Sequence, residues 1–157
     1  MSAARSVPLR RASPDDAPEI ARLLVAFNAE FDEPAPPVDE LAPRVAQLLD
    51  GGDTVIALAG DPMCGVAVMR FRSAIWSPAR ECYLAELYVA PSERGEGIGR
   101  ALLTYALDVA RGEGADYVDL NTAETDTAAR ALYESMGFSS TEHKPGGPMN
   151  IYYERVL

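Results

Sequence analysis

The sequence lacks the features of a membrane or secreted protein. None of its 157 residues belongs to an apolar run approaching the roughly 20 residues that a bilayer span requires. The opening stretch, MSAARSVPLRR, has no apolar centre of the kind found in signal peptides. These absences predict a cytoplasmic protein that does not bind membranes.

Cysteine and histidine are scarce. Cys64 and Cys82 lie in apolar segments, without a Cys-x-x-Cys pair or a nearby histidine cluster, so we expect buried thiols rather than a disulfide framework or a metal site. The sequence has no Gly-x-Ser-x-Gly motif that its only histidine, His143, could serve in nucleophilic catalysis. We therefore expect His143 at the surface.

Basic residues are few: 14 Lys and Arg stand against 24 Asp and Glu, a net charge of -10. This charge opposes attraction to a phosphate backbone, so no nucleic acid partner is expected. An acidic surface can attract cationic substrates, although solubility alone also explains it.

Hydrophobic residues make up 48% of the sequence, which argues against disorder. We expect a flexible terminus over residues 1–6 and a single domain over residues 7–157.

The apolar pattern alternates between strand and helix periods, which predicts an α+β fold with a mixed, mostly antiparallel central sheet flanked by about four helices. Strands are expected at 7–12, 54–60, 64–72, 81–90, 115–121 and 149–157. Helices are expected from the cap Ser13 to Phe31, across Leu41–Leu49, from Ile98 to Gly112 and from Thr125 to Met136. A proline-rich loop over 31–39 is predicted to be rigid and exposed.

The most informative segment is a glycine-rich turn, Arg94 to Gly99, between a predicted strand and a predicted helix. Unpaired N–H groups at a helix N-terminus bind anions, and glycines allow close approach. A dinucleotide fingerprint fails because position 100 is arginine, and the absence of a Gly-Lys pair excludes a Walker A loop. The glycines can also serve only the turn, but three in five residues favour an anion site.

Two motifs together resemble the GNAT superfamily of acyl-CoA-dependent N-acetyltransferases. The first is Arg94-x-x-Gly97-x-Gly99 after a strand, and the second is ALYESMGF after a later strand. The resemblance covers nearly the whole chain, from LRRA to YYERVL. It implies a single GNAT-like domain, acetyl-CoA as co-substrate, no metal and an amine acceptor. Whether the protein forms a homodimer is left open by the resemblance.

The resemblance also implies a donor site. The pyrophosphate of coenzyme A would lie against the backbone amides of the glycine turn, and the pantetheine arm would follow the strand before it, where that strand splays from the segment 115–121. The donor-binding residues so implied are Leu87, Val89, Arg94, Gly95, Gly97, Ile98, Gly99, Arg100, Asp126 and Arg130. Family members usually carry asparagine at the position of Asp126, and an exposed helix arginine is the alternative for Arg130.

Acetyl transfer needs a base, a stabilised oxyanion and a proton for the leaving thiolate. Tyr133 matches the family tyrosine that donates this proton, with packing on the sheet as the alternative. Glu86, the only charged residue within CYLAELYVA, is the candidate base, because burial raises the pKa of a carboxyl. Pairing with Arg70 or Arg72 is the alternative. The family analogy assigns the oxyanion to a backbone N–H of Leu87 or Tyr88.

The sequence thus predicts an N-acetyltransferase that transfers an acetyl group from acetyl-CoA to a primary amine by direct attack in a ternary complex. The expected acceptor is a small cationic amine held by Asp32, Glu33 and Asp39. Its wall is expected from the loop 31–39, the region of Trp76 and the hairpin 143–152. The alternatives are acetylation of a protein N-terminus or lysine, and a non-catalytic acyl-CoA-binding sensor.

Overall fold

The computed structural model describes residues 4–157. The chain divides into a larger unit that ends at Leu120 and a smaller unit, Asn121–Leu157. Of the terminus expected to be flexible, residues 1–3 lie outside the described residues. No helix among residues 4–157 is long and apolar enough to cross a membrane.

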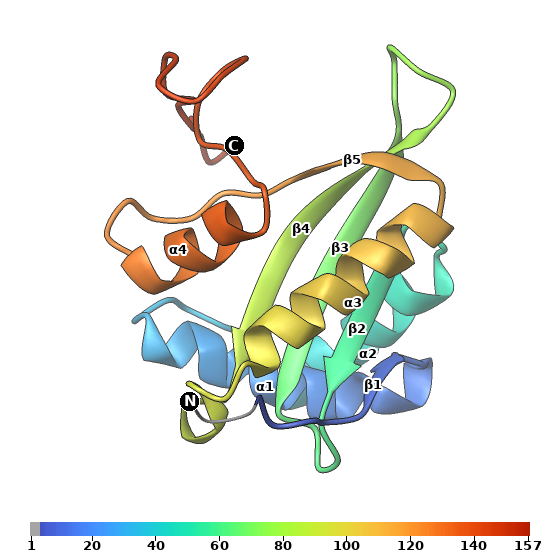
Figure 1. Ribbon diagram of the computed structural model, residues 1–157. Helices are drawn as coiled ribbons and strands as arrows, with labels where there is room; N and C mark the ends of the chain where they lie inside the picture. The colour runs from blue at the N-terminus through green and yellow to red at the C-terminus, as the bar shows by residue number, and fades with distance from the viewer. Residues whose placement is uncertain (1–3) are drawn as a thin grey trace. The chain divides into compact units, whose positions relative to one another are not determined.

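The larger unit is built on a five-stranded sheet in the order β1 to β5 (Figure 1). Its strands are β1 (Leu9–Arg11), β2 (Thr54–Ala59), β3 (Gly65–Ser73), β4 (Arg80–Val89) and β5 (Ala115–Asp119). The first four strands form an antiparallel meander, whereas β5 runs parallel to β4. A parallel pair needs a crossover, and α3 (Ile98–Gly112) supplies it. The predicted α+β class and mixed sheet are confirmed.

Two helices connect β1 to β2: α1 (Ala17–Glu30), which follows the short 3-10 helix η1 (Pro14–Asp16), and α2 (Val38–Asp50). The loop between them ends at Pro37, so Asp39 lies in the first turn of α2 and the expected loop 31–39 is too long by two residues. Pro37 has a fixed φ of -57° at the N-cap, and acidic residues in the first turn favour helix initiation there.

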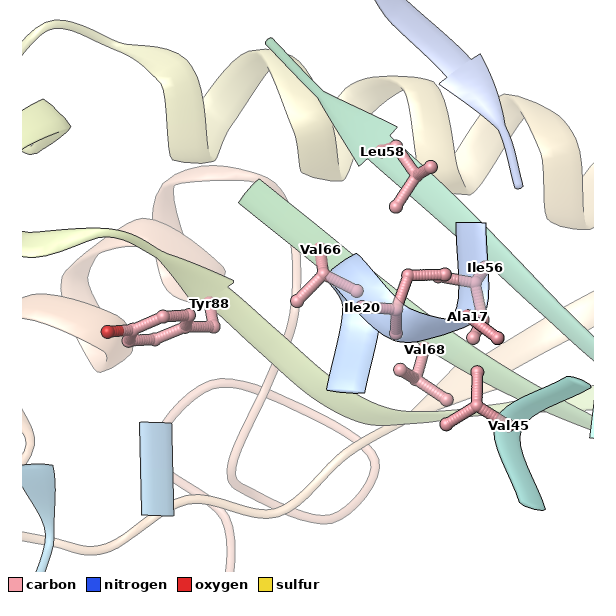
Figure 2. Close-up of a cluster of buried hydrophobic side chains, with 8 residues drawn as sticks. All are labelled: Ala17, Ile20, Val45, Ile56, Leu58, Val66, Val68 and Tyr88. Carbon is pink, nitrogen blue, oxygen red and sulfur yellow. The ribbon is translucent and has the colours of Figure 1, made fainter. Parts of the chain in front are cut away.

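The core lies between one face of the sheet and the pair α1 and α2 (Figure 2). It is formed by Ala17, Ile20, Val45, Ile56, Leu58, Val66, Val68 and Tyr88. Alternate residues of a strand point to opposite faces, so the neighbouring positions face α3. Gly65 illustrates this, because a Cβ there would lie 3.2 Å from Cδ2 of Leu102 in α3.

The smaller unit contains α4 (Thr127–Ser135), which begins two residues later than the expected start at Thr125. The reason is Asp126, whose carboxylate accepts the Ala129 N–H at 3.1 Å and caps the helix. After the helix, the Phe138 ring packs edge-on against Tyr133 with centroids 5.8 Å apart.

The last predicted strand, 149–157, is wrong. A single bridge joins Thr141 to Met149, and within the described chain residues 151–157 form no strand and are exposed. Pro145 and Pro148 lack N–H donors and interrupt a hairpin at this point. The alternating pattern of residues 149–157 is compatible with a strand, but among the described residues this segment pairs with no neighbouring strand. His143 is exposed in this turn, as expected.

Candidate active site

The glycine-rich turn joins β4 to α3 through the short 3-10 helix η2 (Pro91–Glu93). Gly95 and Gly97 have φ values of +83° and +81°, a backbone region that glycine enters without steric cost. Gly97 is the N-cap, and the first helical bond runs from the Ala101 N–H to its carbonyl at 3.1 Å. The amides of Ile98 and Gly99 therefore have no intrahelical acceptor, as anion binding at a helix N-terminus requires.

Arg94, which opens the turn, is engaged inside the larger unit. Its Nη2 donates to the Glu30 carboxylate at 2.9 Å, and its Nε donates to the Val89 carbonyl at 2.9 Å. Its guanidinium carbon lies 5.4 Å from the centre of the Tyr88 ring. Arg94 thus fastens the turn to the end of α1.

The parallel pairing of β4 with β5 ends at Tyr83 and Asp119. Beyond this point β4 continues through Leu84–Val89, with no strand partner along its β5 edge in the described part of the chain. A bulge at Ala85 marks the same region, because Val68 pairs with Glu86 while Met69 pairs with Leu84. A backbone edge without a strand partner therefore leads past Leu87 to Val89, whose carbonyl accepts the Arg94 Nε–H, and on into the glycine-rich turn.

Glu86 lies just after the bulge and opposite Val68, on the sheet face covered by α1 and α2. It is half-buried, and burial raises the pKa of its carboxyl above the ordinary value. Among residues 4–157 the Glu86 carboxylate makes no hydrogen bond or ion pair, although its backbone belongs to the ladder with β3. Arg72, considered as its partner, instead bonds Glu81 at 2.6 Å. Glu86 is a carboxyl with a raised pKa and no paired cation.

The loop after α1 carries the acidic residues expected to hold a cationic acceptor. Asp32 and Glu33 are exposed, and Asp32 has a φ of +54°. The loop is tied back to Asn28, whose Nδ2 donates to the Pro34 carbonyl at 2.9 Å and whose carbonyl accepts the Glu33 N–H at 2.9 Å. These bonds fasten the start of the loop to the last turns of α1.

Trp76 lies in the turn between β3 and β4 and is 94% exposed. It precedes the first residue of β4, Arg80, whereas Glu86 is six residues further along the strand. At about 3.3 Å per residue, roughly 20 Å of strand separates Glu86 from that turn. Trp76 therefore lies at the other end of β4 from the glycine-rich turn.

The smaller unit holds the other predicted residues. Tyr133 is half-buried, and burial together with the Asp126 charge raises its pKa to about 12. Asp126 caps α4, and Arg130 donates to the Glu124 carbonyl at 3.0 Å and lies 3.9 Å from the Glu134 carboxylate. Both side chains thus have partners within their own unit.

Three residues around the glycine-rich turn and the open edge escaped sequence analysis: Arg5, Glu30 and Asp119. Arg5 bonds Glu96 and Glu30 bonds Arg94, both from far away in the sequence, so no local motif could have indicated them. Asp119 ends β5 where the strands part, and its Oδ1 is buried without a hydrogen-bond partner in the described residues. Within those residues no group of three or more His, Cys, Asp or Glu could hold a metal.

Known proteins match this chain in sequence and fold. The family model for the acetyltransferase (GNAT) family matches residues 19–138. The crystal structure of a candidate acetyltransferase from Arthrobacter sp. FB24 superimposes with a TM-score of 0.87 at 42% identity and covers 99% of both chains. An aminoglycoside acetyltransferase from a soil metagenome, solved with sisomicin, has the same fold at a TM-score of 0.75 and 19% identity, covering 96% of this chain and 97% of that one.

Two curated relatives are also named as acetyltransferases. The aminoglycoside N(6')-acetyltransferase type 1 of Stenotrophomonas maltophilia is 28% identical over 85% of this chain and 87% of its own length. The mycothiol acetyltransferase of Beutenbergia cavernae is 40% identical over 43% of this chain. The matches span only 24%, 20% and 44% of the first three curated relatives' lengths.

The chain belongs to the acetyltransferase (GNAT) family. This confirms the resemblance drawn from the two sequence motifs and the GNAT-like fold. The enzyme class expected from the sequence, an acyltransferase, is that of the family and of the relatives named above.

Proposed function

We propose that the protein transfers the acetyl group of acetyl-CoA to a primary amine by direct attack in a ternary complex. The observation that supports this most directly is the open edge of β4, which leads from Leu84 to Val89 and directly into the glycine-rich turn. Backbone groups repeating along a strand suit the amides of a pantetheine arm. A helix N-terminus beyond them suits the pyrophosphate.

In this proposal the donor is held by main-chain groups more than by side chains. The amides of Gly95, Gly97, Ile98, Gly99 and Arg100 face the pyrophosphate, and Leu87 and Val89 follow the pantetheine arm. Arg94 fastens the turn through Glu30 and Val89, and its guanidinium meets the pyrophosphate only in exchange for the bond to Glu30. Asp126 and Arg130 contribute to donor binding only if they exchange the intramolecular bonds that they make within α4 and its cap.

In the proposed mechanism two side chains, Glu86 and Tyr133, each carry out one proton transfer. The amine nitrogen attacks the thioester carbon, and a backbone N–H of Leu87 or Tyr88 stabilises the oxyanion. Glu86, directly or through a water, accepts the proton that the nitrogen loses. The carbon–sulfur bond then breaks, and the Tyr133 hydroxyl protonates the leaving thiolate.

The acceptor is proposed to be a small cationic amine. The fixed loop after α1 presents Asp32 and Glu33 to solvent, and the net charge of -10 favours the approach of a cation. Asp39 contributes less, because it lies in the first turn of α2. Aminoglycosides are the first acceptors to test, since the relative from Stenotrophomonas maltophilia is named as an aminoglycoside acetyltransferase.

Two measurements test the proposal. Saturating coenzyme A, but not NAD or ATP, should raise the melting temperature, with about 2.7 kcal/mol of stabilisation at a hundredfold excess over Kd. Thiol release from acetyl-CoA should then be measured with polyamines, aminoglycosides, amino acids and peptides. No shift with coenzyme A would reject the donor site. A shift without turnover on any amine would favour the non-catalytic sensor.

A further inference from the structure

The segment before β1 lies against the glycine-rich turn (Figure 1). The Arg5 N–H donates to the Glu96 carbonyl at 3.0 Å. The Arg5 guanidinium bonds the carboxylates of Glu93 and Glu96, the latter at 3.4 Å. The contact is close, since a Cβ built on Gly97 would lie 3.1 Å from the Ala4 Cβ.

The main-chain bond acts on a peptide group that belongs to the proposed donor site. The Glu96 carbonyl and the Gly97 N–H share one peptide, and in a trans peptide they point to opposite sides. Arg5 therefore occupies the side of the turn away from the one that the Gly97 N–H faces. Consecutive hydrogen bonds polarise one another, so the bond from Arg5 makes the Gly97 N–H a stronger donor toward an anion.

The side-chain bonds of Arg5 join it to two carboxylates, that of Glu96 in the turn and that of Glu93 just before it. Glu93 and Glu96 place two carboxylates beside a site proposed to bind a pyrophosphate, and like charges repel. The Arg5 guanidinium bonds both carboxylates. The larger unit thus brings a cation from the start of the chain to the two acidic side chains that would oppose the donor.

Main-chain hydrogen bonds fix this segment at two points. It is fixed at Arg5 and again at Pro8, whose carbonyl accepts the Gly60 N–H at 2.9 Å. Between these points it borders a cavity of about 380 Å³, whose lining includes Cys64 and Ser92. Removal of the Arg5 side chain leaves only the main-chain bond to Glu96 and should therefore loosen the segment against the turn, while the paired strand β1 stays in the sheet.

We infer that Arg5 is a positioning residue for donor binding: it braces the glycine-rich turn from behind and neutralises Glu93 and Glu96, so that the opposite side of the turn receives the donor pyrophosphate. This inference rests on the proposed function, because it takes coenzyme A as the donor. It assigns a binding role to a segment that the sequence suggested was a loose terminus.

The first test is the affinity of Arg5→Gln for coenzyme A, measured by calorimetry at low salt. Kd should rise roughly three- to tenfold, the effect of removing one unit charge several ångströms from a polyanion in water. The difference should shrink as salt screens the charges. S-acetylpantetheine, which lacks the pyrophosphate, should bind both proteins equally. The control Arg11→Gln, which removes another exposed arginine bonded to a glutamate, Glu113, should leave Kd unchanged.

A charge-rescue variant tests the mechanism. In the triple variant Arg5→Gln, Glu93→Gln, Glu96→Gln the repulsion is absent, so the affinity for coenzyme A should return to about the original value. An Arg5→Gln variant that binds coenzyme A as tightly as the original protein would overturn the inference. An equal loss of affinity for S-acetylpantetheine, or a triple variant without rescue, would overturn the neutralising role.

Thiol labelling supplies a readout that needs no donor. Cys64 borders the cavity beneath the segment, so Arg5→Gln should increase its rate of alkylation, whereas the fully buried Cys82 serves as an internal control. An unchanged Cys64 rate would overturn the anchoring role of Arg5. If the original protein binds no coenzyme A, the proposed function fails, while the labelling experiment still decides whether Arg5 holds the segment.

Discussion

The Arg94 guanidinium donates to both oxygens of the Glu30 carboxylate, at 2.9 and 3.0 Å. Glu30 is the last residue of α1, directly before the acidic loop proposed to bind the acceptor. Arg94 opens the turn proposed to bind the donor. One ion pair therefore joins the two proposed substrate sites, and an incoming pyrophosphate would compete with Glu30 for the same cation.

Glu30→Gln should separate these effects. Coenzyme A should bind about two- to threefold more tightly at low salt, because a negative charge is lost and Arg94 is released. The KM of the acceptor should change little, because the loop after α1 stays tied to Asn28. Stability should fall by about 1 kcal/mol or less, as for partly exposed ion pairs. Glu19→Gln, which removes the partner of Arg22 on the same helix, is the control. Equal coenzyme A affinity in both variants would contradict the proposed competition.

Gly97→Ala should weaken coenzyme A binding about tenfold. A left-handed backbone costs alanine roughly 1–2 kcal/mol, and turning the 96–97 peptide away would remove a hydrogen bond to a charged group worth about 1.5–3 kcal/mol. Gly52→Ala is a matched control, since Gly52 has the same φ of +81° but no atom near its would-be Cβ. Gly97→Ala should lose somewhat more stability than Gly52→Ala, because its Cβ would lie 3.1 Å from the Ala4 Cβ. If coenzyme A raises the melting temperature of both equally, the turn does not bind the donor.

Glu86→Gln should lower turnover by about a hundredfold or more while raising stability at neutral pH. Burial raises the pKa of Glu86, so the folded protein binds this proton more tightly than the unfolded chain. The ionised carboxylate therefore lowers stability above the folded-state pKa, and this cost disappears as the pH falls below the unfolded value of about 4.5.

Melting temperatures of Glu86→Gln between pH 4 and pH 8 check this sign. The gain should be present at pH 8 and vanish toward pH 4. Glu81→Gln on the same strand breaks the bond to Arg72 and should give no gain at neutral pH. A melting temperature that falls at neutral pH in Glu86→Gln would mean that its carboxylate has a stabilising partner.

Local periodicity predicted most of the elements, including the strands of the meander and α3, because each of these segments shows its buried face in its own sequence. The contacts that shape the candidate site are different. Arg94 and Glu30 are 64 positions apart, and Arg5 and Glu96 are 91 apart, so no short pattern contains either pair. The bulge before Glu86 depends on register with β3. The segment 149–157 shows the reverse error, since alternation without a partner edge gave no strand.

Tyr133→Phe should reduce kcat by roughly 10²- to 10⁴-fold, the range typical of general acid catalysis, with little change in the Kd of coenzyme A. Because its pKa is raised to about 12, the hydroxyl stays protonated across ordinary assay conditions, and no alkaline fall in rate should come from this residue at neutral or mildly basic pH. Tyr117→Phe, at an exposed tyrosine of β5, is the control. Normal turnover in Tyr133→Phe would assign the proton to water or to another group.

The double variant Asp32→Asn, Glu33→Gln should raise the KM of a cationic acceptor by roughly three- to tenfold, since exposed ion pairs contribute up to about 1 kcal/mol each. The affinity for acetyl-CoA should be unchanged. With the original protein, KM should climb as added salt screens the attraction. The loop is already fixed through Asn28, so little conformational entropy is lost on binding and charge should dominate the effect.

The control for the loop is Asp15→Asn with Glu19→Gln, which removes the same charge near the other end of α1, about 20 Å away along the helix. If both double variants shift KM equally, the general charge of the protein attracts the amine and the loop has no specific part. If neither shifts KM on the best amine found, the acceptor is not recognised by its charge. Only a selective effect of Asp32 and Glu33, lost at high salt, assigns acceptor binding to this loop.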